Sequence, residues 1–248
     1  MLIASLGFLT STGEVSRVFD GPPTRSATSF GFGGGRAIYL GMANGRHRDN
    51  TRRLNEILDG AGVRPLFPIS RDDGSRVKDV ETYVFRNGNL TIIALQRDFA
   101  PISNRGSGET VLMALPRPVE VYDLRTQHSL GRTSRLRLEL GQVAPTLLAL
   151  SEAPVPPPEI VAPQRVVRGA NAKFLIRSNA ASPGVVHLDV IDPEGNLTAP
   201  YSENMLVGRE AKRKLLPLAL NDKLGVWKLR VTDRLNGETT VAELQVEP

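Results

Sequence analysis

The sequence contains no cysteine, only three histidines, and few aromatic residues, which make up 5% of its 248 positions. Without cysteine the chain cannot form a disulfide, a thiolate zinc site, an iron–sulfur cluster or a cysteine nucleophile. His47, His128 and His187 are far apart in the sequence, which disfavours a histidine metal centre. We therefore expect no metal and no cofactor.

Long hydrophobic runs are also lacking. No apolar stretch approaches the roughly 20 residues that a transmembrane helix requires, so no membrane partner is expected. The apolar first ten residues have no preceding positive charge and no small-residue cleavage site, and we expect a strand there instead of a signal peptide. The sequence does not indicate a compartment.

The charge has little bias. There are 31 Lys and Arg against 26 Asp and Glu, a net charge of +5. The basic residues are spread along the chain, whereas a nucleic-acid groove needs several cations on one face together with stacking aromatics. No nucleic-acid partner is expected.

The first segment, 1–68, has the pattern of a strand followed by a helix. Residues 36–42 form a short apolar run after a cluster of glycines, as in a strand entered through a tight turn. Apolar residues then recur at helical spacing over 49–61, where Asp49 or Asn50 can cap the helix. Because no second strand–helix repeat completes a parallel sheet, we expect an α/β piece that is truncated at its front.

From about residue 75 the apolar period changes to two, which is typical of strands. The segment 69–152 predicts an antiparallel β domain, with strands at 80–86, 90–97, 110–115, 119–124, 135–140 and 146–150. Asn87-Gly-Asn marks a hairpin between the first two of these strands. Six short antiparallel strands indicate a β-sandwich or half-barrel.

Five prolines within 153–163 indicate a stiff, extended linker. Beyond it, 164–248 has the length and strand rhythm of an immunoglobulin-like β-sandwich. The predicted strands are 173–177, 185–191, 215–220, 226–231 and 241–246.

One local candidate site lies between the first strand and the helix, where Arg46, His47 and Asp49 come together in the sequence. α/β proteins often place ligand groups at such a junction, and a histidine beside a carboxylate can act as a general base. The plainer interpretation is a solvated, positively charged start of the helix. The sequence designates no nucleophile or substrate opposite the histidine, so no catalytic residue is assigned.

A second candidate is a sugar-stacking platform made of Tyr201 and Trp227, the only tryptophan. The alternation over 225–231 places Trp227 on the same face as Leu229 and Val231, which favours a role in the core. Five residues near two loops offer oxygen ligands of the kind that calcium prefers: Asp189, Asp192, Glu194, Asn196 and Asp222. Because turn chemistry alone explains Asp192-Pro-Glu-Gly-Asn, no metal site is assigned.

Three runs in the first half of the chain resemble the C-terminal part of family 42 β-galactosidases. They are Phe32-Gly-Gly-Gly-Arg-Ala-Ile-Tyr-Leu-Gly, Val80-Glu-Thr-Tyr-Val-Phe-Arg-Asn-Gly-Asn-Leu-Thr-Ile-Ile-Ala-Leu and Val119-Glu-Val-Tyr-Asp-Leu-Arg-Thr. The resemblance covers about 30–150 and implies the end of a flavodoxin-like trimerisation domain followed by a small β domain. The fold class predicted is thus mainly β, with two antiparallel β-sandwich domains preceded by a truncated α/β, flavodoxin-like piece.

The catalytic glutamates of that family lie in a barrel to which no part of this chain corresponds, so none is carried over. Residues 165–246 instead resemble the immunoglobulin-like modules of macroglobulin-type proteins. We expect a non-catalytic accessory module set of a larger glycoside-hydrolase-like protein, with other domains or subunits as partners. The alternatives are a carbohydrate-binding module set, with a glycan as partner, or a protein-interaction sandwich.

Overall fold

The computed structural model describes residues 27–32, 35–40, 56–77, 80–97, 108–141, 143–180 and 182–248, the first two ranges as backbone only. The chain divides into two compact units, 1–64 and 65–248. Each is considered by itself below.

In the first unit two strands form an antiparallel hairpin. Strand β1 (Ala27–Phe32) pairs with β2 (Gly35–Leu40), and Phe32 lies opposite Gly35. β2 matches the strand predicted over 36–42, and the hairpin partner β1 is new. Of the helix predicted over 49–61, residues 56–60 are helical, and its start lies outside the described residues. The strand expected at the N-terminus lies outside them too.

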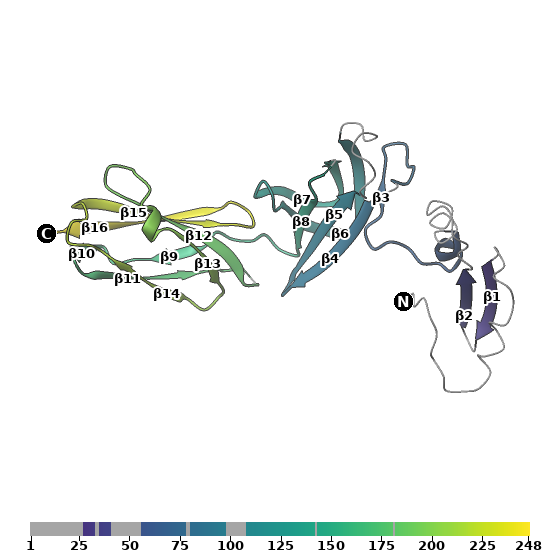
Figure 1. Cartoon of the computed structure of the whole chain (residues 1–248), viewed down its shortest axis with the longest axis horizontal. Coiled ribbons are helices and arrows are strands. Elements are labelled where there is room, and N and C mark those ends of the chain that lie inside the picture. The colour runs from purple at the N-terminus through teal and green to yellow at the C-terminus, as the bar shows by residue number, and fades with distance from the viewer. Residues whose placement is uncertain are drawn as a thin grey trace. The chain divides into compact units, whose positions relative to one another are not determined.

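The second unit begins with a six-stranded antiparallel sheet in the order β3-β6-β8-β5-β4, with β7 paired to β6 (Figure 1). Its strands are β3 (Ile69–Ser70), β4 (Val80–Asn87), β5 (Leu90–Arg97), β6 (Glu109–Asp123), β7 (His128–Leu140) and β8 (Thr146–Ser151). Alternate residues of β5, β6, β7 and β8 enclose one core, in which Ile93, Val111, Met113, Val121 and Leu148 have no exposed surface.

The two strands predicted at 110–115 and 119–124 are one strand, β6. Pro116 and Pro118 lie in its middle, and because proline has no N–H to donate, the ladder with β7 is interrupted there. The register shifts between Ala114 and Val119, but the backbone stays extended on both sides. The two prolines therefore mark an irregularity inside one long strand and do not separate two strands.

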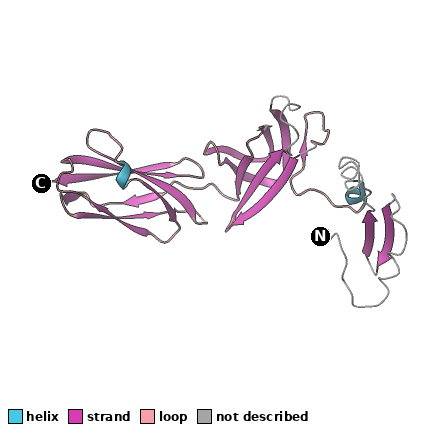
Figure 2. Ribbon diagram, in the orientation of Figure 1, coloured by secondary structure: helices cyan, strands magenta, loops and turns pink. Residues whose placement is uncertain are grey.

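The remaining strands form two further sheets, one of five strands in the order β10-β16-β15-β12-β13 and one of three in the order β14-β11-β9. They are β9 (Glu159–Val161), β10 (Arg165–Val167), β11 (Asn171–Arg177), β12 (Gly184–Ile191), β13 (Glu203–Val207), β14 (Lys212–Pro217), β15 (Gly225–Asp233) and β16 (Thr239–Glu247). A short 3₁₀ helix, η3 (Ala199–Tyr201), lies between β12 and β13. Figure 2 shows that strands make up nearly all the regular structure of this unit.

The strand order is that of an immunoglobulin-like sandwich. The chain enters in the three-stranded sheet as β9, crosses to the other sheet as β10, and pairs there in parallel with the last strand, β16. All other pairings in the two sheets are antiparallel. The mainly β fold class is thus confirmed. β9 lies within the predicted linker, so the end of that segment is a strand.

The two sheets pack face to face on one apolar core. Phe174 and Ile176 of β11 meet Leu188 of β12, Trp227 of β15 and Leu244 of β16, all of them buried. Lys214 of β14 forms an ion pair with Glu203 of β13, which connects the two sheets along one edge. Within the described part of the chain no helix is long and apolar enough to cross a membrane.

Candidate functional site

The sequence-based candidate Arg46, His47 and Asp49 lies outside the described residues. Its role as a ligand site or as a solvated helix start stays a prediction.

Trp227 lies in the core of the C-terminal sandwich and is 2% exposed. Its indole N–H donates to the carbonyl oxygen of Lys223 over 2.9 Å, so the one polar atom of the ring is satisfied. Tyr201 packs beside it with ring centroids 6.3 Å apart and the planes tilted by 49°. Tyr201 is partly buried and donates its hydroxyl to Asp222 over 3.0 Å. The two rings therefore pack against each other at the core of the sandwich, and the burial of Trp227 agrees with the alternation around it.

The turn after β12 is organised by Asp192. One of its carboxylate oxygens accepts from the backbone N–H groups of Glu194 and Asn196, each over 2.9 Å. The other oxygen accepts from the ammonium of Lys223 over 2.6 Å, and this contact, the largest cause, holds the pKa of Asp192 down at about 2. Lys223 also reaches Glu194 over 2.6 Å. An ammonium group therefore lies between these two carboxylates.

The five candidate calcium ligands do not converge on one point, because their side chains bond to different groups of the protein. Asp222 receives the Tyr201 hydroxyl and the Ala219 N–H, and Asp189 lies on the sheet with Arg230. In the part of the chain that the structure describes, no three His, Cys, Asp or Glu side chains are grouped to hold a metal. Local turn chemistry accounts for Asp192-Pro-Glu-Gly-Asn.

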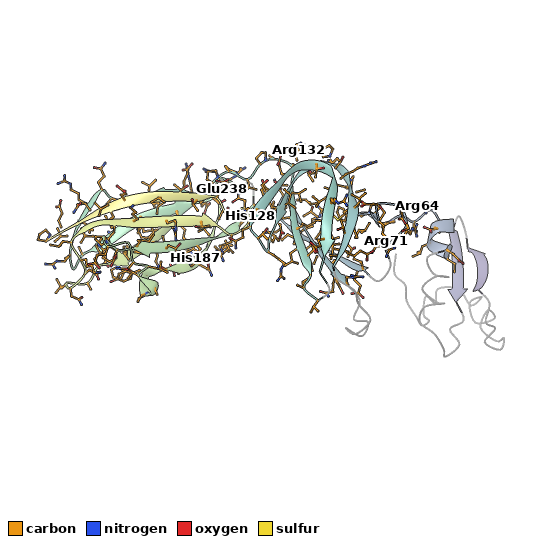
Figure 3. All side chains as sticks on the ribbon, turned by 90° about the horizontal axis from the view of Figure 1, so that it is seen from above. Arg64, Arg71, His128, Arg132, His187 and Glu238 are labelled. Atoms are coloured by element: carbon orange, nitrogen blue, oxygen red, sulfur yellow. The ribbon has the colours of Figure 1, made fainter. Side chains whose placement is uncertain are left out.

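A polar row crosses the five-stranded sheet. The guanidinium of Arg230 donates to Asp189 over 2.8 and 3.0 Å, and the other oxygen of Asp189 lies 3.1 Å from Nε2 of His187. Nδ1 of His187 lies 2.8 Å from the side-chain oxygen of Asn204. Figure 3 shows His187 on this sandwich. The row links β13, β12 and β15 through side chains and reinforces the sheet.

A shallow hollow of about 240 Å³ lies on the outer face of the three-stranded sheet. It is lined by Glu159, Val161, Leu175, Arg177 and Ala211. Arg177 donates to Glu159 over 2.7 Å and Asn179 donates to the same carboxylate. These two hydrogen bonds hold the pKa of Glu159 below its usual range, and the one from Asn179 has the larger effect. The polar groups of the hollow thus bond to one another.

A set of long-range hydrogen bonds joins the two β regions of 65–248. Val155, in the segment between them, donates its N–H to the hydroxyl of Tyr122 on β6 over 2.9 Å. Its carbonyl oxygen accepts from the side-chain amide of Asn236 in the β15–β16 turn, also over 2.9 Å. Thr240 then donates to the carbonyl oxygen of Pro158 over 2.6 Å. The connecting segment is bonded on both sides.

A second contact involves the β4–β5 hairpin. The backbone N–H of Asn89 donates to the hydroxyl of Ser182 over 2.7 Å, and the side chain of Asn87 donates to the carbonyl oxygen of Pro183 over 3.2 Å. Gly88 between them has φ +56°, and a Cβ there would lie 2.5 Å from the Ser182 Oγ. Only glycine fits this turn without displacing the neighbouring loop.

A small apolar cluster completes the junction. Tyr122, Ala149, Val155 and Ala180 are buried together, with Leu124 and Leu235 against them. On a third side the β6–β7 and β15–β16 turns meet, because a Cβ on Gly237 would lie 2.7 Å from the carbonyl oxygen of Gln127. His128, the first residue of β7, and Glu238, which precedes β16, follow these two residues in the sequence and are labelled in Figure 3.

Burial changes the acidity of two groups at this junction. It raises the pKa of Asp233, which is 3% exposed, and the Leu235 N–H that bonds to its carboxylate opposes the change. Burial also raises the pKa of Tyr122, with smaller contributions from Glu120, Asp233 and Glu238. Both groups therefore lie in the buried part of the junction.

No protein-family model matches the chain, and no curated protein matches it in sequence. Among solved structures it is similar to two crystal structures of Salmonella alpha-2-macroglobulin, one of a point mutant and one of the protein reacted with methylamine. Both comparisons cover 70% of this chain at 16% identity, with TM-scores of 0.30 and 0.31. The chain spans 13% of the length of each of those proteins.

Sequence reasoning did not find the junction. The local sequence predicts only a strand position for Tyr122 and turn positions for Asn87 and Asn236. The contacts join positions 33, 81, 93 and 96 residues apart, and no local pattern signals such pairs. The burial of Tyr122 gave no signal either, because Val121 beside it is also buried and alternation places the two on opposite faces of the strand.

Proposed function

We propose that this chain supplies non-catalytic accessory modules to a larger glycoside-hydrolase-like protein, where 65–248 acts as a stiff spacer that fixes the separation of neighbouring domains. The observation that supports this proposal is the bonded connection between the two β regions. A free linker leaves domains to reorient, whereas here the connecting segment donates to one side and accepts from the other.

The glycoside-hydrolase context comes from the sequence. The three runs within 30–150 resemble the region that follows the barrel in family 42 β-galactosidases. In that family this region is accessory to the catalytic barrel. The partners proposed for this chain are therefore other domains or subunits of the same assembly.

The stiffness can be measured by pulsed electron spin resonance on the full chain. Because the chain has no cysteine, Glu139→Cys and Lys228→Cys place spin labels at two exposed strand positions, one in each β region, without background. We expect a single narrow distance distribution. A broad distribution in the otherwise unaltered chain contradicts the spacer role.

The junction's contribution is tested by adding Asn236→Ala, which removes the donor to Val155, to the labelled chain. We expect the distribution to broaden. Asn221→Ala, at an exposed loop position of the same sandwich, is the matched control and leaves the distribution unchanged. Equal effects of the two variants oppose a specific role for the junction.

The non-catalytic part is tested separately. The purified chain is expected to leave aryl galactosides unhydrolysed over long incubations. Hydrolysis that disappears when one of the chain's own carboxylates is replaced refutes the accessory role, whatever the stiffness measurement gives.

A further inference from the structure

Strand β4 is an edge strand with exposed apolar side chains. It is the last strand in the order of its sheet, and among the described strands it pairs only with β5. Large apolar side chains are exposed on both of its faces: Tyr83 is 47% exposed, Val84 42% and Phe85 53%. The pairing with β5 runs from Val80 to Asn87 without a register shift, and the strand has no proline, lysine or bulge to block further pairing.

The backbone direction along this edge follows from the hairpin. Asn87 and Leu90 pair across the two turn residues Gly88 and Asn89, and a turn bonds the carbonyl of its first residue to the N–H of its fourth. The backbone of Asn87 therefore faces β5. By the alternation of an antiparallel ladder, positions 80, 82, 84 and 86 direct their N–H and carbonyl groups outward from the sheet.

We propose that β4 pairs with β4 of a second copy of this chain, antiparallel and about a two-fold axis at Val84. In this register Val84 exchanges two backbone hydrogen bonds with the partner's Val84, and Thr82 lies opposite the partner's Arg86. The proposal is independent of the accessory function proposed above.

We infer a second copy of this chain as the partner because similar side chains lie on the two sides of Val84. Tyr83 and Phe85 flank it, and the two-fold axis brings each aromatic ring opposite the other kind on the same face. These are non-hydrogen-bonded positions, where Cα atoms approach to about 4.5 Å and cross-strand aromatic pairs stabilise most. A two-fold interface requires such a self-complementary surface.

The charges agree with this register. Glu81 lies opposite the partner's Asn87, and Arg86 lies opposite the partner's Thr82, so no like charges face each other. Tyr83 donates its hydroxyl to Glu81, which raises the pKa of Tyr83 and holds its ring along the strand.

The dimer is expected to be weak. Stable complexes bury about 1,200–2,000 Å² in total, and one strand pair with its side chains supplies less than that. Sedimentation equilibrium of the full chain should therefore show a monomer that converts to a dimer with rising concentration. A chain that stays monomeric at all accessible concentrations overturns the proposal. This holds even if the β4 edge is found to bind an extended peptide of another protein.

Single cysteines test the register. In the proposed pairing, Val84→Cys places two sulfurs across the axis at a Cα separation of about 5.5 Å, which a disulfide can span. Thr82→Cys is the matched control, because two positions 82 are offset by four residues, or about 14 Å, along the strands. We expect oxidised dimer from Val84→Cys and at least tenfold less from Thr82→Cys. Comparable yields from both variants overturn the register.

A backbone variant separates strand pairing from general stickiness. Val84→Pro removes an N–H that faces away from β5, so the fold should tolerate it, and the melting temperature of the variant checks this. We expect the concentration-dependent dimer to be lost. A folded Val84→Pro chain that dimerises like the unaltered one refutes pairing through this edge. Should the variant not fold, the cysteine pair still decides the question.

Discussion

The backbone N–H of Val155 donates to the hydroxyl of Tyr122 over 2.9 Å, and both groups are buried. The two residues are 33 positions apart, in a strand of one β region and in the segment that leads to the next. The contact satisfies two polar groups that water does not reach. It also makes the connecting segment part of the packed structure.

Tyr122→Phe removes the acceptor and leaves the Val155 N–H buried without a partner. We expect a loss of about 1–3 kcal/mol in the free energy of unfolding, measured by chemical denaturation. Tyr83→Phe removes an exposed hydroxyl and should change stability by less than about 0.5 kcal/mol. A Tyr122→Phe chain as stable as the unaltered one would show that the hydrogen bond contributes nothing.

Trp227 gives a second measurement. Its ring is buried and is the only tryptophan of the chain, so its fluorescence reports the C-terminal sandwich alone. We expect blue-shifted emission in the folded protein and a red shift on unfolding. Trp227→Ala should cost about 3–5 kcal/mol, whereas Phe85→Ala, at an exposed site, should cost little. Emission typical of a water-exposed indole in the native chain contradicts this placement.

Asp192 makes stability depend on acidity. Its pKa is about 2 in the folded chain against 3.8 as the ordinary value, so the folded state binds this proton less readily than the unfolded state. The stabilisation is complete above the ordinary value and is lost as pH falls toward 2. Asp192→Asn should be less stable at neutral pH, with a difference that shrinks over this acid range. If the stability difference between the two chains stays constant with pH, its cause is not the charge of Asp192.

Asp233 is expected to act with the opposite sign. Burial raises its pKa above the ordinary 3.8, so the folded state binds the proton more readily. Its contribution is most favourable below that ordinary value and declines as pH rises through the folded pKa. Asp233→Asn should therefore be more stable than the unaltered chain at pH 7, because no charge is buried, and the gain should vanish in acid. Thermal melts at several pH values measure both effects. An Asp233→Asn chain that is less stable than the unaltered chain at pH 7 contradicts the prediction.

Several elements were predictable because their side chains follow a local rule. The alternation over 135–140 and 225–231 gave the strands and their buried faces, including that of Trp227. Asn87-Gly-Asn gave the hairpin turn because glycine alone adopts its conformation readily. Strands β1, β3, β9, β10 and β13 were not predicted because they are short or lack a clean alternation, and their pairing partners hold them in place.

The junction illustrates what local rules cannot supply. The prolines around Val155 indicate an extended segment, but its hydrogen bonds depend on where Tyr122 and Asn236 lie after folding. The domain boundaries at 69–152 and 164–248 and the site at Arg46, His47 and Asp49 stay predictions.

The absence of cysteine and of long hydrophobic runs was settled by the sequence alone, since no fold can alter which chemical groups are present. The two-residue apolar period and the turn residues also determined that the chain is mainly β, because alternation is a property of neighbouring residues. The tertiary structure decided that β6 continues past its prolines, that Lys223 lies between Asp192 and Glu194, and that β4 lies at the edge of its sheet with no described strand beyond it. Each of these depends on distances between residues remote in sequence, which only the packing of the sheets determines.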